Sequence, residues 1–336
     1  MNRFQKILIF RQSSLGDVVL TFPVVACLAE TFSGCRIDFV TKAAFVELVQ
    51  SHPAVRTVYA FNDNRDFYRL AWVLKRERYD LLVDLQNNIR SRLLGILASP
   101  AKLVRYPKRR ASREMVVRRA QLKLSVDHTV SAYFSALRKI GVEKNPAPSF
   151  LTVPQKAQEF ADDLLGKHDM SSKTLIAICP GARHYEKRWP PENFRNVALT
   201  LMERGDIGVI LITSAFDDIP VRMGIDSPSL IELRDDAIIN IAAFLSRCRI
   251  AACNDSGLMH LANAVGVPVL AIFGPTNPRL GFAPILPGSQ VICDDVFCSP
   301  CSVHGEKPCR QPRKYCFDNI TSLCVSAQLM TMLGQR

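Results

Sequence analysis

The sequence predicts an α/β protein built from two doubly wound domains in series. It has 336 residues, of which 48% are hydrophobic, enough for two domains that each bury a core of their own. Short β-branched runs alternate with amphipathic segments along nearly the whole chain, as in parallel sheets with crossover helices. Pro146, Pro148 and Pro154 lie close together, and a helix cannot continue through them, so we place the boundary between residues 1–150 and 151–336.

The first domain is predicted to alternate strands and helices. The expected strands are Lys6–Arg11, Arg36–Thr41, Val55–Phe61, Asp80–Leu85 and Lys102–Tyr106. Amphipathic helices fit Val18–Phe32 and Phe67–Arg78. The proline-rich segment Glu143–Phe150 is then the predicted inter-domain linker.

The second domain repeats this order. Its expected strands are Thr174–Cys179, Gly208–Thr213, Leu230–Leu233, Ile250–Asn254 and Val267–Phe273, and its expected helices are Glu192–Arg204, Ala237–Arg247 and Leu258–Val265. Doubly wound domains bind ligands at the carboxyl ends of their strands. Two of them in series therefore imply a cleft between the domains, with sites at those strand ends.

The positive charge is concentrated in the first domain. Residues 1–150 carry 25 Lys and Arg against 12 Asp and Glu, whereas residues 151–336 carry 18 against 19. The segment from Lys102 to Lys123 holds nine basic residues and one acidic residue, Glu114. Such a patch predicts an anionic partner, which is nucleic acid, an anionic membrane surface, or a phosphorylated or acidic substrate.

The sequence is expected to belong to a cytoplasmic protein. The apolar run Ile7–Phe10 is far too short for a signal peptide. No stretch approaches the ~20 apolar residues that are needed to cross a bilayer. In a reducing compartment the 11 cysteines are expected to be buried apolar residues or metal ligands rather than disulfides.

The turn after the first strand, Arg11–Asp17, places a carboxylate at a helix N-terminus. It has one glycine, Gly16, where a dinucleotide fingerprint needs three, which disfavours a nicotinamide-dependent dehydrogenase. One hypothesis is that Asp17 or Ser14 simply caps the helix. The other is that Asp17, ionised at neutral pH, acts as a general base for an attacking hydroxyl.

The loop Cys179–Pro190 leaves a strand and enters a helix. It carries a glycine and the cations Arg183, Lys187 and Arg188, a good combination for binding phosphate near a helix N-terminus. The alternative is a solvated basic loop in which Trp189 packs against the core.

A third loop, Asn254–His260, has the same strand, turn and helix order. Ser256 and the backbone N–H groups after Gly257 are suited to a diphosphate, and His260 lies one turn into the helix. The alternative is a capping turn followed by a structural histidine. The rigid turn Phe273–Pro278 closes the next strand end. Several anion-binding loops at successive strand ends predict a nucleotide-diphosphate site in the second domain.

Together these motifs resemble glycosyltransferase family 9, the bacterial ADP-heptose:lipopolysaccharide heptosyltransferases, and the second domain is most similar to the heptosyltransferase II group. The resemblance rests on Ser14–Asp17, Cys179–Ala182 with Lys187–Pro190, Asn254–His260 and Phe273–Thr276, in the family's order and spacing. It implies the GT-B architecture, in which two Rossmann-like domains face a central cleft. It also implies an inverting single displacement that requires no cofactor and no active-site metal.

The resemblance also implies roles for residues of this chain. Asp17 would be the catalytic base and Lys187 would stabilise the leaving diphosphate. The ADP-sugar pocket would contain Arg183, Asp218, Asp255, Ser256, Gly257, Leu258 and His260, with Asp218 standing where related enzymes have a ribose-binding Glu. The acceptor would lie near Ser14, Gly16, Arg109, Arg110 and Arg113.

The acceptors of the resembled family give the basic segment a specific partner. They are lipid A-core saccharides at the cytoplasmic face of the inner membrane. We expect the acceptor, or the membrane surface around it, to bind the cations Arg105, Lys108, Arg109, Arg110, Arg113, Arg118 and Arg119. The alternative is a solvated helix face.

The C-terminal cysteines have the spacing of a four-thiolate zinc site. They are Cys298, Cys301, Cys309 and Cys316. The alternative is a loop with free or partly oxidised thiols. A metal there would hold the C-terminal tail in place and take no part in the chemistry.

Three other functions compete with heptosyl transfer from ADP-heptose. One is a related transferase that uses another nucleotide sugar, and another is a catalytically silent relative, although Asp17 and Lys187 are both present. The third is a basic nucleic-acid-binding protein with a zinc module. That third reading is disfavoured because Tyr106 alone is available for base stacking between Lys102 and Lys123.

Overall fold

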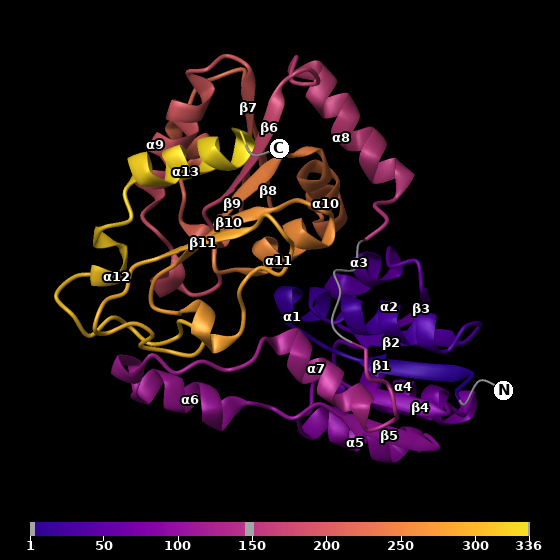
Figure 1. Ribbon diagram of the computed structural model, residues 1–336. Coiled ribbons are helices and arrows are strands. Elements are labelled where there is room, and N and C mark those ends of the chain that lie inside the picture. The colour runs from indigo at the N-terminus through magenta and orange to yellow at the C-terminus, as the bar shows by residue number, and fades with distance from the viewer. Residues whose placement is uncertain (1–3, 145–150, 335–336) are drawn as a thin grey trace. The chain divides into compact units, whose positions relative to one another are not determined.

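A computed structural model describes residues 4–144 and 151–334, and most of the predicted linker Glu143–Phe150 lies outside these residues (Figure 1). The chain forms two compact units. Unit 1 comprises residues 1–109 and 127–152, and unit 2 comprises residues 110–126 and 153–336. Each unit is an α/β structure around one parallel sheet, which confirms the predicted fold class.

The sheet of unit 1 has the strand order β3-β2-β1-β4-β5, and all its strands are parallel. The strands are β1 (Lys6–Phe10), β2 (Arg36–Thr41), β3 (Val55–Ala60), β4 (Leu81–Asp84) and β5 (Lys102–Arg105). Each lies within a residue or two of its predicted position. The order reverses between β1 and β4, where doubly wound sheets bind their ligands.

Helices cover both faces of this sheet (Figure 1). They are α1 (Leu15–Val19), α2 (Phe22–Thr31), α3 (Val46–Gln50), α4 (Asn64–Glu77), α5 (Ile89–Ala98) and α7 (Thr129–Arg138). The single predicted helix Val18–Phe32 is in fact two, α1 and α2. A new helix starts here because Pro23 is favourable only in a first helical turn, and it lies in the first turn of α2.

Unit 2 has the strand order β11-β10-β9-β6-β7-β8, again all parallel. The strands are β6 (Thr174–Cys179), β7 (Ile207–Thr213), β8 (Leu230–Arg234), β9 (Ile250–Asn254), β10 (Val269–Phe273) and β11 (Gln290–Cys293). The strand β11 was not predicted from the sequence, because it is a four-residue, half-buried edge strand without a long β-branched run. The strand order reverses between β6 and β9.

The helices of unit 2 lie on both faces of its sheet, with α9 and α13 on one side and α8, α10 and α11 on the other (Figure 1). Their bounds are α8 (Gln155–Lys167), α9 (Pro191–Met202), α10 (Ile238–Arg247), α11 (Gly257–Ala264), α12 (Tyr315–Asp318) and α13 (Ser322–Gly334). Trp189 and Phe194 are fully buried at the centre of the α9 side, with their rings edge to face. No described helix has the length and hydropathy that a membrane span needs.

The segment Arg110–Val126, which includes α6 (Arg110–Arg118), belongs to unit 2. The sequence-based boundary at residue 150 places it in the first domain instead. Arg113 explains the difference, because its Nε donates to the Leu280 carbonyl and its guanidinium lies over the Phe282 ring. The backbone N–H of Val126 also donates to the carbonyl of Arg279.

Candidate functional site

In unit 1, the loops after β1 and β4 meet at the point where the strand order reverses. The backbone N–H of Gln12 donates to Oε1 of Gln86 at 3.0 Å, which ties the two loops together. The first loop carries Asp17, and the second carries a run of amides and arginines from Gln86 to Arg92. Polar side chains from both loops therefore gather at one edge of the sheet.

Asp17 lies one turn into α1 and is partly buried. Its Oδ2 forms an ion pair with Arg11 Nη2 at 2.7 Å and accepts hydrogen bonds from the Ser14 backbone N–H and Oγ at 3.2 and 3.0 Å. Burial acts to raise the pKa of Asp17, but the Arg11 charge and the Ser14 hydrogen bonds outweigh it and leave the pKa below its ordinary value. Asp17 is thus an ionised carboxylate that also forms a capping box with Ser14.

These contacts use only one of the two carboxylate oxygens of Asp17. Among the described residues, all three partners bind Oδ2. The capping role and a proton-accepting role are therefore compatible, since Oδ1 is left for a second partner.

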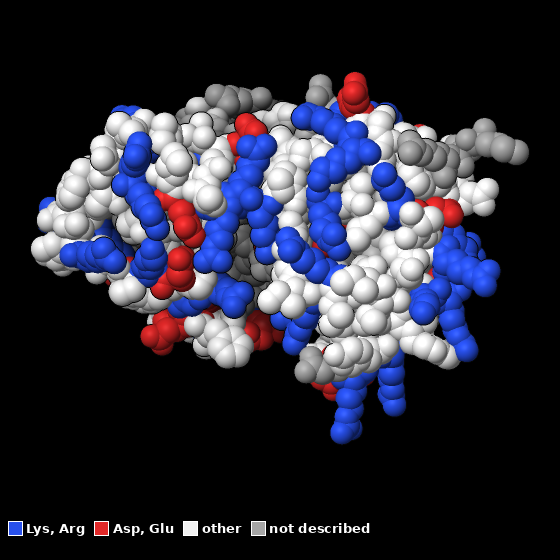
Figure 2. Space-filling model, turned by 90° about the horizontal axis from the view of Figure 1, so that it is seen from below, with Lys and Arg blue, Asp and Glu red and all other residues white. Residues whose placement is uncertain are grey.

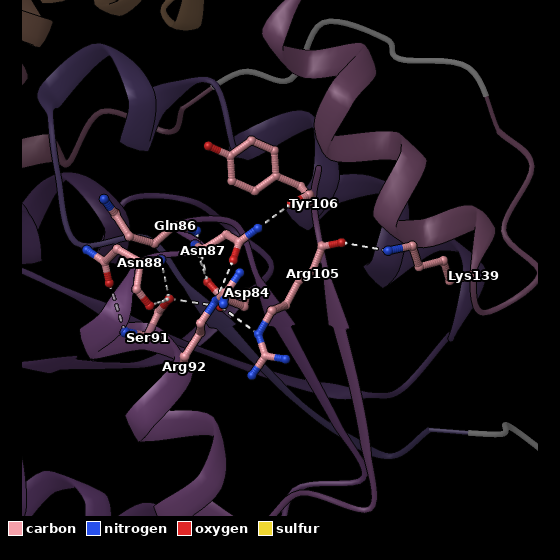
Figure 3. Close-up of polar contacts among 9 residues, drawn as sticks. All are labelled: Asp84, Gln86, Asn87, Asn88, Ser91, Arg92, Arg105, Tyr106 and Lys139. Atoms are coloured by element: carbon pink, nitrogen blue, oxygen red, sulfur yellow. Dashed lines mark hydrogen bonds and ion pairs between the residues drawn. The ribbon is translucent and has the colours of Figure 1, made fainter. Parts of the chain in front are cut away.

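The loop after β4 is held by the buried carboxylate of Asp84 (Figure 3). Oδ1 of Asp84 accepts from the backbone N–H groups of Gln86 and Asn87, at 3.0 and 2.7 Å. Oδ2 accepts from Ser91 Oγ at 2.8 Å and Arg105 Nε at 3.2 Å. One charged group at the end of the strand thus fixes both the turn and the start of α5.

This loop lines a pocket of about 600 Å³ that the sequence analysis did not predict. The lining residues are Gln12, Asn87, Asn88, Ile89, Arg90, Arg92 and Lys108. Three of them are cationic and none is acidic, so the pocket suits an anion. Arg92 is oriented by a hydrogen bond from its Nε to Oδ1 of Asn87 at 3.1 Å. The sequence does contain a signal for this pocket, because the strand end at Asp84 is followed by amides and arginines that could bind an anion.

The basic segment from Lys102 to Lys123 does not form one binding surface. Arg105 is bound to Asp84 in unit 1, whereas Arg113 is bound to Leu280 and Phe282 in unit 2. Two other acceptor candidates form ion pairs, Arg109 with Asp127 and Arg110 with Glu114. Arg118 and Arg119 are exposed. Lys108 lines the pocket described above, which we call the anion pocket. Ser14 is exposed and Gly16 is buried beside it.

In unit 2, the loops after β6 and β9 meet at the corresponding position. Lys187 Nζ forms an ion pair with Asp255 Oδ2 at 2.6 Å, and both side chains are largely buried. Thr276, in the loop after β10, donates to the same Asp255 oxygen at 2.7 Å. Asn254 joins the loops a second time, because its Oδ1 accepts from the Trp189 backbone N–H at 3.1 Å.

The other residues of the β6 loop have structural partners. Arg188 donates to the carbonyls of Ala182 and Asp217 and forms an ion pair with the Asp217 carboxylate at 3.2 Å. Trp189 is fully buried and donates to the Ile320 carbonyl, so the predicted packing role of Trp189 is confirmed. A Cβ at Gly181 would collide with the Asp217 carboxylate, so a larger residue there would have to displace Asp217 from its place beside Arg188. Arg183 is exposed.

Ser256 is the N-cap residue of α11, yet its hydroxyl does not cap the helix. Its Oγ is buried and has no hydrogen-bond partner among the described residues. A buried hydroxyl without a partner costs free energy, so a ligand that binds it gains that contact. Gly257 and Leu258 follow at the helix N-terminus, and His260 is buried one turn further on.

Asp218, predicted from the resemblance to contact a ribose, is exposed at the end of the short 3-10 helix Ala215–Asp217. Its backbone is left-handed, with φ of 54°. The preceding carboxylate, Asp217, is the one directed toward Gly181 and Arg188. Burial raises the pKa of Asp217 even though Arg188 lies beside it.

The four cysteines of the predicted zinc site line one small pocket of about 20 Å³, together with Glu186 and Lys314 among others. They are Cys298, Cys301, Cys309 and Cys316. Among the described residues, no group of three or more His, Cys, Asp or Glu side chains is arranged to hold a metal ion. The proximity predicted from the spacing is therefore found, but the structure does not support the zinc site itself.

Comparison with known proteins decides the family. The family model described as "Glycosyltransferase family 9 (heptosyltransferase)" matches residues 67–310, more than half of the chain. The chain belongs to this family. As a member of it, the protein is a glycosyltransferase, as the motifs predicted.

Two curated relatives show how far the similarity extends. The chain is 27% identical to lipopolysaccharide heptosyltransferase 1 of Pseudomonas aeruginosa, over 98% of each chain. It is 28% identical to lipooligosaccharide heptosyltransferase 2 of Haemophilus influenzae, over 81% of this chain and 84% of that one.

Solved structures of the family share the fold over both units. Heptosyltransferase II of Escherichia coli matches with a TM-score of 0.76 at 21% identity, over 98% of this chain and 99% of that chain. A family 9 glycosyltransferase from Veillonella parvula matches with 0.84 at 19% identity, over 100% and 99%. The heptosyltransferase WaaC of E. coli, solved with ADP, matches with 0.70 at 18% identity, over 97% and 99%. The match to these enzymes agrees with the expected GT-B class.

Proposed function

We propose that this family 9 glycosyltransferase transfers heptose from ADP-heptose to the inner core of lipopolysaccharide, with inversion at the anomeric carbon. The observation that carries the proposal is the pairing of Lys187 with Asp255 at 2.6 Å, where the strand order of unit 2 reverses. This is the position at which doubly wound sheets bind nucleotides. The names of the curated relatives support the heptose and the lipopolysaccharide acceptor.

The nucleotide diphosphate is assigned to the loops after β6 and β9. The unpartnered Ser256 Oγ, the N–H groups at the start of α11 and the ammonium of Lys187 supply donors for its oxygens. Arg183, in the loop after β6, and Asp218, in the loop after β7, are both exposed. They remain candidates for contacts with the parts of the nucleotide outside the diphosphate. The structures of the heptosyltransferase WaaC with ADP and with ADP-2-deoxy-2-fluoro heptose support an ADP-sugar as the donor.

The chemical step is a single displacement at the anomeric carbon of the donor. The acceptor hydroxyl attacks that carbon, its proton passes to Asp17 Oδ1, and the bond to the diphosphate oxygen breaks, so that ADP leaves. Asp17 is already ionised because its pKa lies below the ordinary value. Lys187 stabilises the charge that grows on the diphosphate. The mechanism requires no metal and no other cofactor, because Lys187 supplies the positive charge.

The acceptor is assigned to the anion pocket of unit 1. Arg90, Arg92 and Lys108 line it, and Gln12 connects it to the loop of Asp17. The inner core of lipopolysaccharide is an anionic saccharide, so its charged groups suit three cations. Of the earlier candidates, Arg109 directly follows Lys108 of this pocket in the chain, whereas Arg110 and Arg113 belong to unit 2. We place the protein at the cytoplasmic face of the inner membrane, where these acceptors are.

Turnover tests the proposal directly. The purified protein is incubated with ADP-heptose and a panel of core acceptors that carry or lack the first heptose, and the released ADP and the glycosylated product are measured. We expect transfer to at least one acceptor and an inverted product anomer. A retained anomer, or transfer only from another nucleotide sugar such as a UDP-sugar, contradicts the proposal. A thermal shift produced by a DNA duplex but not by ADP would favour a nucleic-acid-binding protein instead.

A further inference from the structure

We propose that the exposed face of α4 binds the anionic surface of a membrane. This face, the α4 surface, consists of Arg65, Tyr68, Arg69, Trp72, Val73, Lys75 and Arg76. The biological reason for such contact rests on the proposed function, because its acceptor is anchored in a lipid layer. The structural reasons lie within unit 1 and do not depend on the acceptor.

The helix α4 is amphipathic, but its charged outer side also carries two large aromatic residues. Its inner side packs Phe67, Leu70 and Leu74 into the core of unit 1, where they are buried. Its outer side presents Tyr68 and Trp72, which are 59% and 56% exposed. These two aromatic residues are four positions apart and therefore lie on the same helix face. The core explains the inner residues, whereas both outer aromatic residues stay more than half exposed, even with Arg76 stacked on Trp72.

Cations surround the aromatic pair. The guanidinium of Arg76 lies 3.4 Å from the centre of the Trp72 ring. Arg65, Arg69 and Lys75 are exposed and form no ion pair with any described residue. The helix has two acidic residues: Glu77 pairs with Lys6 and Arg36, and Asp66 is half-buried in the first turn.

The neighbouring helix α5 extends the same kind of surface. It packs against α4 and exposes Ile89 and Ile96, which are 86% and 71% accessible, next to the cations Arg90 and Arg92. Figure 2 shows one face of the molecule, on which Lys and Arg side chains are prominent and acidic side chains are fewer. Because α4 and α5 pack against each other, their exposed apolar and basic side chains lie on neighbouring helices of unit 1.

This combination fits a lipid surface better than another protein. Trp and Tyr prefer the interface between water and lipid headgroups, where the ring is in the apolar layer and the polar atom stays hydrated. Basic side chains beside them are attracted to the anionic headgroups of such a surface. The apolar face of α4 is buried in the core, so the membrane contact we propose is made by the exposed aromatic residues and the cations around them.

Tryptophan fluorescence tests the α4 surface in the intact protein. The chain has two tryptophans, and Trp189 is fully buried, so a change caused by lipid reports on Trp72. Full-length protein is mixed with vesicles of phosphatidylethanolamine and phosphatidylglycerol, or of phosphatidylcholine alone, with and without brominated acyl chains. We expect a blue shift and quenching by brominated lipid with the anionic vesicles, and neither effect in Trp72→Phe.

A matched pair of charge variants tests the cations. Arg69→Glu with Lys75→Glu replaces two positive charges of the α4 surface with two negative ones, and we expect vesicle binding to weaken at least about tenfold. Lys156→Glu with Lys167→Glu makes the same change in net charge on exposed positions of α8, and we expect it to keep most of the binding. Both pairs should retain turnover with a soluble, delipidated acceptor.

Three results would overturn the proposal. The first is no binding of the wild-type protein to anionic vesicles, and the second is equal loss in the two charge variants. The third is that the protein sediments as a dimer and Trp72 is already shielded from solvent without lipid. The α4 surface would then be an interface between two copies of the chain. Vesicle binding is measured without substrates, so it stays informative even if heptosyl transfer itself is not found.

Discussion

Lys187 Nζ lies 2.6 Å from Asp255 Oδ2, and this pair joins the loops after β6 and β9 of unit 2. Both side chains are largely buried, and Thr276 donates to the same carboxylate oxygen. Asp255 therefore orients the lysine rather than leaving it to move in solvent. A cation held in this way can act on a leaving group without first being ordered, which is the condition for electrostatic catalysis.

Lys187→Ala is expected to lower kcat by about 10²- to 10³-fold, because the charge that stabilises the departing diphosphate is lost. The variant should also unfold at a lower temperature, because the carboxylate of Asp255 loses its ionic partner. Steady-state kinetics and calorimetric melting measure the two effects. Lys167→Ala, on an exposed position of α8, is the control and should change neither. A near-normal kcat in Lys187→Ala would show that Lys187 is only a structural partner of Asp255.

Ser256→Ala tests whether the Ser256 hydroxyl binds ADP, and we expect it to do so without changing the stability of the fold. The Ser256 Oγ is buried without a partner among the described residues, so its removal should not destabilise the fold. If the hydroxyl binds the diphosphate, the Kd for ADP should rise by about tenfold, the value of one hydrogen bond to a charged group.

Ser326→Ala is the matched control for this variant. Its Oγ is also buried and unpartnered, but it lies on α13, away from the strand ends. Titration calorimetry with ADP should give the same Kd for Ser326→Ala as for the wild type. Equal Kd values for both variants would remove Ser256 from the nucleotide site.

Arg11→Gln is expected to shift the acid limb of the pH profile of kcat/KM to higher pH. Asp17 acts as a base only when it is ionised, and the Arg11 charge is the main cause that lowers its pKa. Without that charge, burial dominates and the pKa of Asp17 rises, so activity is lost at a higher pH on acidification. Lys144→Gln, which breaks the exposed pair with Glu30, serves as control and should leave the profile in place. An unshifted limb in Arg11→Gln would mean that another group sets it.

Asp17→Asn tests the base itself. It keeps the size of the side chain but removes the charge, and we expect turnover to fall by about 10²- to 10⁴-fold. The Kd for ADP should be unchanged, because Asp17 belongs to unit 1 and the proposed diphosphate loops belong to unit 2. Near-normal turnover would show that Asp17 serves only in the capping box with Ser14.

The sequence predicted the strands well because buried parallel strands are short β-branched runs, as in Ile250–Asn254 and Thr174–Cys179. It also predicted the loops of Lys187 and Asp255, since each follows such a strand. It did not show that these two side chains pair, because the contact spans two loops 68 positions apart in the chain and depends on the strand order.

The basic segment shows what charge counting cannot resolve. Arg105 and Arg113 each add one positive charge to the segment. Arg105, however, binds the buried Asp84 in unit 1, whereas Arg113 lies over the Phe282 ring in unit 2. Net charge carries no information about which partner each guanidinium finds. The anion pocket was missed for the same reason, because Arg90 and Arg92 lie outside the densest run of cations.

Arg92→Ala and Lys108→Ala should raise the KM for an anionic acceptor without a comparable fall in kcat. Both side chains line the anion pocket, and each is expected to contribute about 1.5–3 kcal/mol through hydrogen bonds to a charged group, that is, roughly ten- to a hundredfold in KM. The KM for the nucleotide sugar should stay the same, because its proposed site is in unit 2.

Arg113→Ala is the comparison that distinguishes this pocket from a general basic surface. It removes the same charge, but Arg113 is bound to the Leu280 carbonyl and to the Phe282 ring. We therefore expect lower thermal stability and an acceptor KM close to that of the wild type. If Arg113→Ala raised the acceptor KM as much as Arg92→Ala does, the cations would act through their summed field, and the assignment of the acceptor to the pocket of unit 1 would be wrong.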